Sequence, residues 1–312
     1  LGRVRCHYLF DPTYTAALNR LHAFTPRAGR DYAGRRNYDD VAHVSGLSPY
    51  LRHRIITEED VLQATLARHS GQAAEKFVQE VFWRTYWKGW LEQRPSVWTS
   101  YLDDLNGALN NVQTQSGLRS AWADACSGKT GIDCFDHWAR ELVQSGYLHN
   151  HARMWFASIW VFTLRLPWTL GADFFMRHLL DGDPASNTLS WRWVAGLQTK
   201  GKTYLARADN IAKYTNGRFT PRGLATTAVP LEGPEHPMRT PLPTSDVIDP
   251  AKRTGLLLTE EDLSPGWLLD RVVPVASATL QTTASRSPLL ISDRVSAFVR
   301  DSQHDCVTRF AH

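Results

Sequence analysis

Cysteine is scarce in this sequence, and its spacing argues against the common metal sites. Cys6, Cys126, Cys134 and Cys306 are widely separated and form no zinc signature. A four-cysteine iron–sulfur site with scattered ligands stays open as an alternative. Free thiols in a reducing compartment are the simpler interpretation, so we expect a cytoplasmic protein without a metal site.

Long apolar segments are also missing. The longest candidate, residues 154–166, is shorter than the roughly 18 residues needed to cross a bilayer, and Arg165 interrupts it. Residues 1–6 contain no apolar segment of the kind found in signal peptides. We therefore expect neither a membrane span nor a secretory leader.

Strand patterns are almost absent before residue 225, whereas helical patterns recur. A capping box with Asp in place of the usual Glu predicts a helix start at Thr57. Other helices are expected, by apolar spacing, over 11–24, 72–93, 133–146, 150–166 and 170–181. Residues 25–50 are polar and loop-like. Residues 1–224 are thus predicted to form one all-α domain.

The composition changes after residue 224. Residues 226–252 contain six prolines and few large apolar residues, so 225–253 is predicted to be an extended linker. Residues 254–312 are predicted to form a small α/β fragment. No internal repeat is present.

Tryptophan is unusually concentrated. Eleven of the twelve tryptophans lie between Trp83 and Trp193. Most suit an aromatic core, although such a cluster also suits stacking on bases or electron transfer. The net charge of +4 does not by itself indicate nucleic-acid binding.

A short polar segment combines two carboxylates with an amide. Asp181 and Asp183 flank a glycine, and Asn187 follows four residues later. These groups could accept hydrogen bonds from hydroxyl or ring N–H groups of a ligand. Taken alone, the segment is better explained as a turn in which an aspartate caps a helix that begins at Pro184.

The segment does not stand alone. Trp191-Arg-Trp follows it, Tyr-Leu-His-Asn-His-Ala-Arg-Met precedes it at 147–154, and Glu-Val-Phe-Trp-Arg lies at 80–84. Ser-Gly-Leu-Ser-Pro-Tyr-Leu lies earlier, at 45–51. In this order and at these distances the four blocks resemble the flavin-binding half of DNA photolyases and cryptochromes. The similarity covers about residues 32–219 and implies an all-α, photolyase-like FAD-binding helical domain.

The resemblance implies a set of FAD-binding residues. The pyrophosphate would be held by Tyr32 and the loop residues Ser45, Leu47 and Ser48, although Val44 stands where the family often has Thr. The other cofactor contacts implied are Arg84, Asn150, Arg153, Asp181, Asp183 and Asn187, with Asn187 facing flavin N5. A buried ion pair between Arg153 and Asp181 that joins two helices is the purely structural alternative, and the resemblance includes it.

The resemblance also implies a pocket for a DNA lesion. Family members that repair cyclobutane pyrimidine dimers offer a Glu, two Trp, an Asn and a Met. The counterparts here are Glu80, Trp83, Asn150, Met154 and Trp193. Indoles can pack on the faces of a flipped dimer while polar groups bond its imide edges. The alternative is that Trp83 and Trp193 are ordinary core residues.

A third implied set is an electron relay of three tryptophans. Trp191 and Trp168 match its inner two positions, but residues 106–120 contain no aromatic residue to match the outer one. Trp155, Trp160 or Tyr204 are candidate substitutes.

DNA contacts are less well marked. His151 replaces an Arg that commonly faces phosphate in the family. The basic residues after the Trp-rich block could contact the DNA backbone or simply form a solvated face; they are Lys200, Lys202, Arg207 and Lys213.

Three functions remain open at this point. The first is a light-driven photolyase that binds FAD and repairs pyrimidine dimers in UV-damaged DNA. The second is a cryptochrome-like photoreceptor that signals to a protein partner through residues 225–312. The third is a flavin-free descendant of the fold with a structural or nucleic-acid-binding role. We expect no N-terminal antenna domain, because the segment before Tyr32 is too short to contain one.

Overall fold

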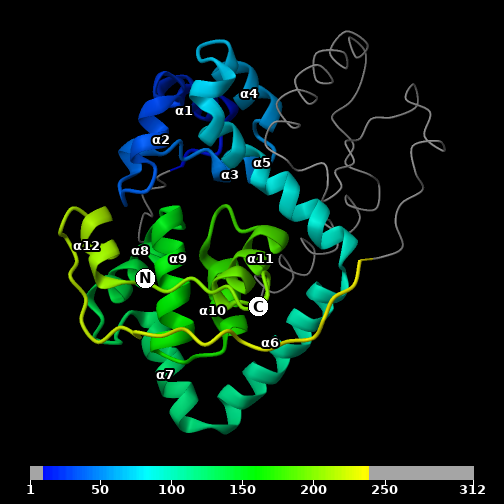
Figure 1. The fold of residues 1–312 in the computed structure, drawn as a ribbon, viewed down its shortest axis with the longest axis vertical. Coiled ribbons are helices and arrows are strands. Elements are labelled where there is room, and N and C mark those ends of the chain that lie inside the picture. The colour runs from blue at the N-terminus through cyan, green and yellow to red at the C-terminus, as the bar shows by residue number, and fades with distance from the viewer. Residues whose placement is uncertain (1–9, 239–312) are drawn as a thin grey trace, which may run out of the picture. The chain divides into compact units, whose positions relative to one another are not determined.

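The computed structural model describes residues 10–238, and the regular structure in this part is helical throughout (Figure 1). No strand is present among the described residues. The helices are α1 Tyr14–Phe24, α2 Arg30–Arg35, α3 Ser48–Arg52, α4 Glu58–Leu66, α5 Gly71–Gln93, α6 Ser96–Thr114, α7 Ser116–Ser127, α8 Asp133–Ser145, α9 Asn150–Ser158, α10 Trp168–His178, α11 Pro184–Ala195 and α12 Ala208–Tyr214. The all-α class expected from the sequence is confirmed.

Local sequence signals set several helix boundaries. The capping box at Thr57 is present: Thr57 Oγ1 accepts a hydrogen bond from the Asp60 amide at 3.2 Å, and Asp60 Oδ2 accepts from the Thr57 amide at 2.7 Å. Helix α8 ends at Gly146, where φ is 70°. A Cβ at Gly146 would lie 2.6 Å from Cγ of Leu180, so glycine allows both the left-handed turn and the close approach. The Gly146 carbonyl accepts from the Leu180 amide at 2.8 Å, which holds the start of α9 beside the turn before α11.

The chain divides into two compact units. The described residues of the first are 10–81 and 96–235, and those of the second are 82–95 and 236–238. Helix α5 runs through the boundary between Val81 and Phe82. The domain limits expected from the sequence stay a prediction. Residues 225–238 contain no helix or strand, and the α/β fragment expected at 254–312 lies outside the described residues.

The first unit contains two hydrophobic clusters. The larger is built mainly by α6 to α11 and includes the fully buried indoles of Trp138, Trp155, Trp160 and Trp191. The smaller surrounds Phe24 and draws on α1 to α4 and the start of α5. Four of the tryptophans are therefore core residues, as the simpler interpretation of their clustering predicts.

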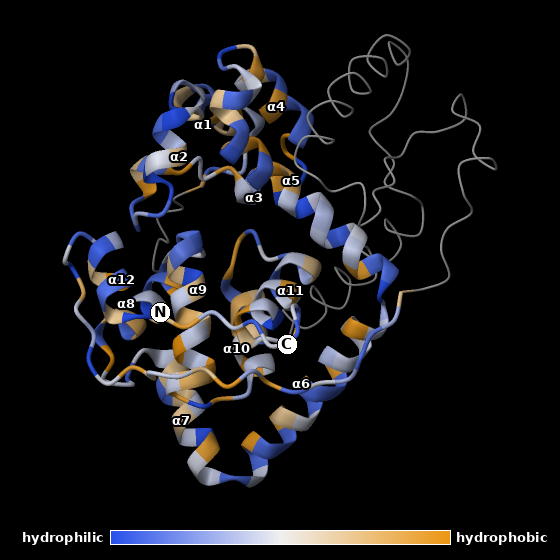
Figure 2. Ribbon diagram, viewed as in Figure 1, coloured by the Kyte–Doolittle hydropathy of each residue, from blue (hydrophilic) through white to orange (hydrophobic). Residues whose placement is uncertain are grey.

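Helix α6 shows how one apolar stripe fixes a helix to this core. Its buried residues recur every three or four positions and are Val97, Tyr101, Leu105, Ala108 and Val112. In Figure 2 apolar and polar residues alternate along α6, as an amphipathic surface helix requires. The helix packs against α10.

Two predicted segments differ from the structure. Residues 25–50 contain the short helices α2 and α3 rather than loop alone. The helix expected over 150–166 ends at Ser158 and continues as a π-helical turn, Ile159–Thr163, closed by the Leu164 amide donating to the Ile159 carbonyl at 2.9 Å. Pro167 disfavours helical geometry in the residue before it, which accounts for the break before α10.

The described residues offer neither a membrane span nor a metal site. None of the helices there is long and apolar enough to cross a bilayer. The same residues contain no group of His, Cys, Asp or Glu that could hold a metal ion, and Cys126 and Cys134 are free thiols.

Candidate functional site

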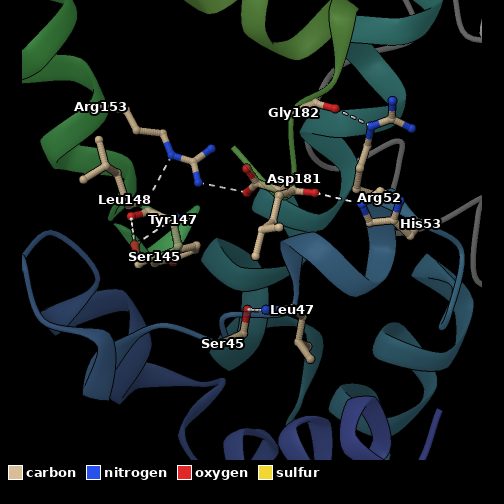
Figure 3. Close-up of polar contacts among 11 residues, drawn as sticks. Ser45, Leu47, Arg52, His53, Ser145, Tyr147, Leu148, Arg153, Asp181 and Gly182 are labelled. Atoms are coloured by element: carbon tan, nitrogen blue, oxygen red, sulfur yellow. Dashed lines mark hydrogen bonds and ion pairs between the residues drawn. The ribbon is translucent and has the colours of Figure 1, made fainter. Parts of the chain in front are cut away.

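An ion pair joins α9 to the turn between α10 and α11. Nη2 of Arg153 lies 2.9 Å from Oδ2 of Asp181, and Nε of Arg153 donates to the Leu148 carbonyl at 2.9 Å (Figure 3). The Asp181 side chain is 3 % exposed and that of Arg153 is 23 % exposed. Burial lowers the pKa of the Arg153 guanidinium, whereas the charge and hydrogen bond of Asp181 raise it. The second effect is the larger, so the pKa lies above its ordinary value. The turn therefore holds a charged pair largely removed from water.

A second arginine ties α3 to the same turn. Nε of Arg52 donates to the Gly182 carbonyl and lies 3.9 Å from Oδ2 of Asp183. A ring nitrogen of His53 lies 2.9 Å from the Leu180 carbonyl. The two contacts fix the backbone of residues 180–183 against α3, on the opposite side from the Arg153 contact (Figure 3).

Asp183 and Asn187 are placed by the first turns of α11. Asp183 is the N-cap: its Oδ1 accepts from the Ser186 amide at 2.9 Å, and Pro184 occupies the first helical position. Nδ2 of Asn187 donates to the Ala172 carbonyl at 2.8 Å. Because a carbonyl can only accept, this contact identifies the nitrogen and leaves Oδ1 of Asn187 without a hydrogen bond from the described residues.

The predicted phosphate loop is a tight turn. Gly46 has φ 60°, and a Cβ there would lie 2.5 Å from Nη1 of Arg20. The Leu47 amide donates to Oγ of Ser45 at 3.3 Å (Figure 3), and Ser48 is the first residue of α3. Two hydroxyls and a nearby guanidinium are thus gathered at one loop, which suits an anionic ligand.

Tyr32 belongs to the smaller cluster, and the partly buried Glu80 lies near enough to act on it electrostatically. Nη1 of Arg36 donates to Oε1 of Glu80, and Oε2 of Glu80 accepts no hydrogen bond from the described residues. The Tyr32 ring packs against Phe77 at a centroid distance of 5.1 Å. Burial is the main cause of a raised pKa at Tyr32, and the negative charge of Glu80 is the second. This phenol is therefore a neutral hydrogen-bonding group.

Trp83 and Arg84 belong to the second unit, in the C-terminal half of α5. Trp83 is 45 % exposed, which argues against the interpretation that it is an ordinary core residue. Its indole stacks on that of Trp87 at a centroid distance of 5.4 Å and an interplanar angle of 26°. Arg84 is partly buried.

Asn150 and Met154 face the same side of α9. Asn150 is exposed and is the first residue of the helix, and its Nδ2 lies 4.0 Å from Sδ of Met154, one turn later. Arg153 precedes Met154 on the helix, so the side chains expected at the lesion and at the cofactor share one helical segment.

Trp193 is partly buried and stacks on Tyr204 at a centroid distance of 5.7 Å. The Tyr204 hydroxyl lies 3.1 Å from Nε2 of His151, whose Nδ1 lies 2.8 Å from the Asn37 carbonyl. His151 is buried, and burial lowers its pKa. His151 is therefore a buried packing residue here.

The two predicted relay tryptophans lie on adjoining helices. Trp191 follows Asn187 by one turn on α11 and is buried against Gly171 of α10. Trp168 begins α10, one turn before Gly171, and is 7 % exposed. The four basic residues expected near DNA are not buried: Lys200, Lys202, Arg207 and Lys213. Their role stays a prediction.

Two arginines at the site were not predicted from the sequence. Arg52 lies 130 positions before Gly182, and Arg36 lies 44 positions before Glu80. Arg52 directly follows the 45–51 block, so its position next to a predicted ligand loop could have marked it as a candidate site residue. Nothing in the local pattern marks Arg36.

Comparisons with known proteins agree with this geometry. Residues 77–222 match the family model described as the FAD binding domain of DNA photolyase. The chain is 32% identical over 219 residues to a deoxyribodipyrimidine photo-lyase of Synechococcus sp. The aligned residues cover 65% of this chain and 43% of the relative. It is 32% identical over 263 residues to the deoxyribodipyrimidine photo-lyase of Thermus thermophilus, with 82% of this chain and 58% of the relative covered.

A solved structure shows the same fold. A bacterial class III photolyase from Agrobacterium tumefaciens superposes with a TM-score of 0.56 at 27% identity, over 67% of this chain and 44% of that one. The chain spans less than two thirds of the length of each of these relatives. The matched segment contains α6 to α12 together with Arg153, Asp181, Asn187 and both relay tryptophans. This chain therefore belongs, through its helical FAD-binding domain, to the DNA photolyase and cryptochrome family.

Proposed function

We propose that this chain binds FAD and uses blue light to split pyrimidine dimers in DNA, the activity of a deoxyribodipyrimidine photo-lyase. The observation that carries the proposal is the buried Arg153–Asp181 pair, followed on α11 by Asn187, whose Oδ1 is left open to accept a hydrogen bond. The relatives described above carry the name of this activity.

The residues present fit the cofactor. FAD offers ribose and ribityl hydroxyls, ring N–H groups and a pyrophosphate. Asp181 and Asp183 supply acceptors for the hydroxyl and N–H groups, while Ser45, Ser48 and the Leu47 amide supply donors near the pyrophosphate. Oδ1 of Asn187 can accept from a flavin N–H.

The charges at the turn suit a neutral ring next to an anionic tail. Arg153 and Arg52 are both held by acceptors of residues 181–183, so their positions are fixed before a ligand arrives. Fixed donors and acceptors need no reorganisation on binding, which favours affinity. Tyr32, Arg84 and Asn150 are further proposed contacts.

At the substrate end, the chain offers polar groups for a lesion's edges and indoles for its faces. Oε2 of Glu80 and the exposed amide of Asn150 can bond imide groups. Met154 and Trp193 add apolar surface in the first unit. The resemblance adds the exposed indole of Trp83, in the second unit, as a further proposed contact. Stacking on an indole contributes about 1–3 kcal/mol per base.

When bound, FAD supplies the light-driven one-electron chemistry, which the side chains themselves cannot perform. The chain's task is to hold a flipped dimer by its edges and to exclude water around it. A hydrogen bond stabilises negative charge that develops on the dimer carbonyls only where the protein group is the donor. This assigns the role to the Asn150 amide, whose Nδ2 can donate, and not to the Glu80 carboxylate.

The test uses a short oligonucleotide with one thymine dimer, FAD-loaded protein reduced with dithionite, and blue light. Wild type is expected to restore the thymines. Trp193→Ala should keep its flavin but bind the lesion about tenfold more weakly, which corresponds to about 1.4 kcal/mol. Trp122→Ala on α7 is the matched control, because Trp122 is another partly buried indole on a helix that carries none of the proposed site residues.

Two results would count against the proposal. A folded wild-type protein that binds no FAD would leave only the flavin-free alternative. A protein with full, reduced FAD that repairs nothing would favour the photoreceptor alternative, with a partner at residues 225–312.

A further inference from the structure

A row of aromatic rings leads from Trp168 to the surface of α6. The Tyr101 centroid lies 5.5 Å from that of Trp168 and 5.2 Å from that of Trp98. Tyr101 and Trp98 are three residues apart on α6, which packs against α10. Tyr101 is 3 % exposed, whereas Trp98 is partly exposed. The row therefore connects a nearly buried indole with one that reaches solvent.

The inner end of the row begins at Trp191. Its indole lies against Gly171, one turn after Trp168 on α10, although the two indoles make no ring contact with each other. Nε1 of Trp191 is buried and has no hydrogen-bond partner among the described residues. An oxidised Trp191 therefore has no base to receive its proton, and the apolar surroundings disfavour the radical cation. The positive charge is expected to move outward, to a ring where solvent stabilises it.

The other aromatic routes do not reach solvent in the same way. Trp160 contacts Trp191 at 6.1 Å, but it is fully buried and its remaining ring partners are phenylalanines, which are much harder to oxidise. Among the described residues, no ring contact links Trp155 or Tyr204 with Trp191 or Trp168. Of the routes that start at the inner tryptophans, the one through Tyr101 ends at a partly exposed indole.

We propose that Trp98 is the outer electron donor of this protein and that Tyr101 bridges it to Trp168. The row supplies electrons from the start of α6, outside the segment 106–120 that lacks an aromatic residue. This inference rests on the FAD binding proposed above.

Each electron and proton in this relay has a source and a destination. Trp191 gives one electron to the light-excited flavin, Trp168 gives one to oxidised Trp191, and Trp98 gives one to oxidised Trp168 across the Tyr101 ring. Oxidised Trp98 then loses its indole proton to water and is left as a neutral radical. A thiol reductant such as dithiothreitol returns one electron and one proton to Trp98, and the resulting thiyl radicals end as a disulfide.

The experiment uses the full chain loaded with oxidised FAD. Blue-light pulses are followed by transient absorption and electron paramagnetic resonance, with every signal normalised to bound flavin. Trp98→Phe is expected to lose most of the long-lived tryptophan radical and to be reduced more slowly under continuous light with dithiothreitol. Trp98→Tyr should replace the tryptophan spectrum with a tyrosyl spectrum, a change that loss of packing alone cannot produce.

Trp122→Phe on α7 is the matched control, because Trp122 is partly buried and makes no ring contact with the row. It should give the wild-type radical yield. A full tryptophan-radical yield in Trp98→Phe, with FAD bound, would overturn the assignment of Trp98 and leave the proposed repair function standing. A wild-type chain that binds no FAD would overturn both.

Discussion

A Cβ atom on Gly171 would lie 2.3 Å from Cη2 of Trp191, so α10 and α11 can meet at this point only because position 171 is glycine. The contact sets the position of Trp191, the proposed innermost relay tryptophan, relative to α10. It also places Asn187, one turn earlier on α11, beside the Ala172 carbonyl to which it donates.

Gly171→Ala is therefore expected to destabilise the fold. The added methyl group would press on Trp191 and on Trp160, two large rings that are fully buried, and overpacking of this kind costs about 1–3 kcal/mol. Urea unfolding would measure the change. Gly107→Ala on α6 is the matched control: its Cβ would meet nothing within 4 Å, and better helix propensity should stabilise the chain by up to about 1 kcal/mol. Equal effects of the two variants would contradict the packing argument.

Asp181→Asn should reduce both stability and flavin content. The substitution keeps the shape of the side chain but leaves the Arg153 guanidinium without its counter-charge, a loss of roughly 3–5 kcal/mol where such a pair is well buried. Flavin content is read from the ratio of visible to ultraviolet absorbance. Asp173→Asn, which breaks the more exposed pair with Arg177, should change stability by about 0.5 kcal/mol or less. Full flavin occupancy in folded Asp181→Asn would show that this carboxylate does not hold the cofactor.

Two substitutions at Asp183 separate its roles as helix cap and as ligand. Asp183→Ala removes the acceptor for the Ser186 amide and should cost about 1 kcal/mol or more. Asp183→Ser keeps a good N-cap while removing the carboxylate, so any stability that it loses reports the ion pair with buried Arg52 and not the cap. If Asp183→Ser also retains full flavin, the carboxylate contributes only to folding, and the proposed cofactor contact is wrong.

Acid should destabilise the fold through His149. Burial lowers the pKa of His149 to about 4, and its Nε2 has no hydrogen-bond partner among the described residues. The unfolded chain takes up a proton near pH 6.5, whereas the folded chain does so only near pH 4. The contribution of His149 is therefore complete above pH 6.5 and is lost as the pH falls toward 4, with a total of roughly 3 kcal/mol.

Unfolding free energies of His149→Asn, measured between pH 7 and pH 4, test this expectation. Nδ1 of His149 accepts from the His151 amide at the start of α9, and Asn can replace that acceptor without titrating. The variant should show a flatter profile than wild type over this range. An unchanged slope would mean that other groups govern the acid sensitivity.

The sequence predicts the elements that rest on local signals. Residue types at Thr57 and Asp60 are enough to define a capping box, and a long apolar period followed by Pro95 is enough to define α5. The Arg153–Asp181 pair could be anticipated as well, but only through the resemblance to a family, because no periodicity connects residues 28 positions apart.

Other features depend on contacts between residues far apart in the sequence, which local sequence patterns do not predict. The Arg36–Glu80 and Arg52–Asp183 pairs form because α2 and α3 pack against distant segments, and several other arginines nearby would have fitted the pattern equally well. Helix α6 lies outside the segments predicted to be helical, since its exposed face is rich in Asn, Asp and Gly, which weaken the local helical signal. The pairing of Trp98 with Tyr101 and Trp168 depends on the packing of that helix on α10.

The π-helical turn at Ile159–Thr163 amounts to one extra residue inserted into a helix. Each residue of an α-helix turns the chain by about 100°, so removing one residue here would restore regular winding while rotating α9 by that angle relative to α10. Asn150, Arg153 and Met154 would then all face a different direction, although none of them had been changed. A single-residue deletion in this turn is therefore expected to keep the helical backbone intact while turning the side chains of α9 away from the proposed site.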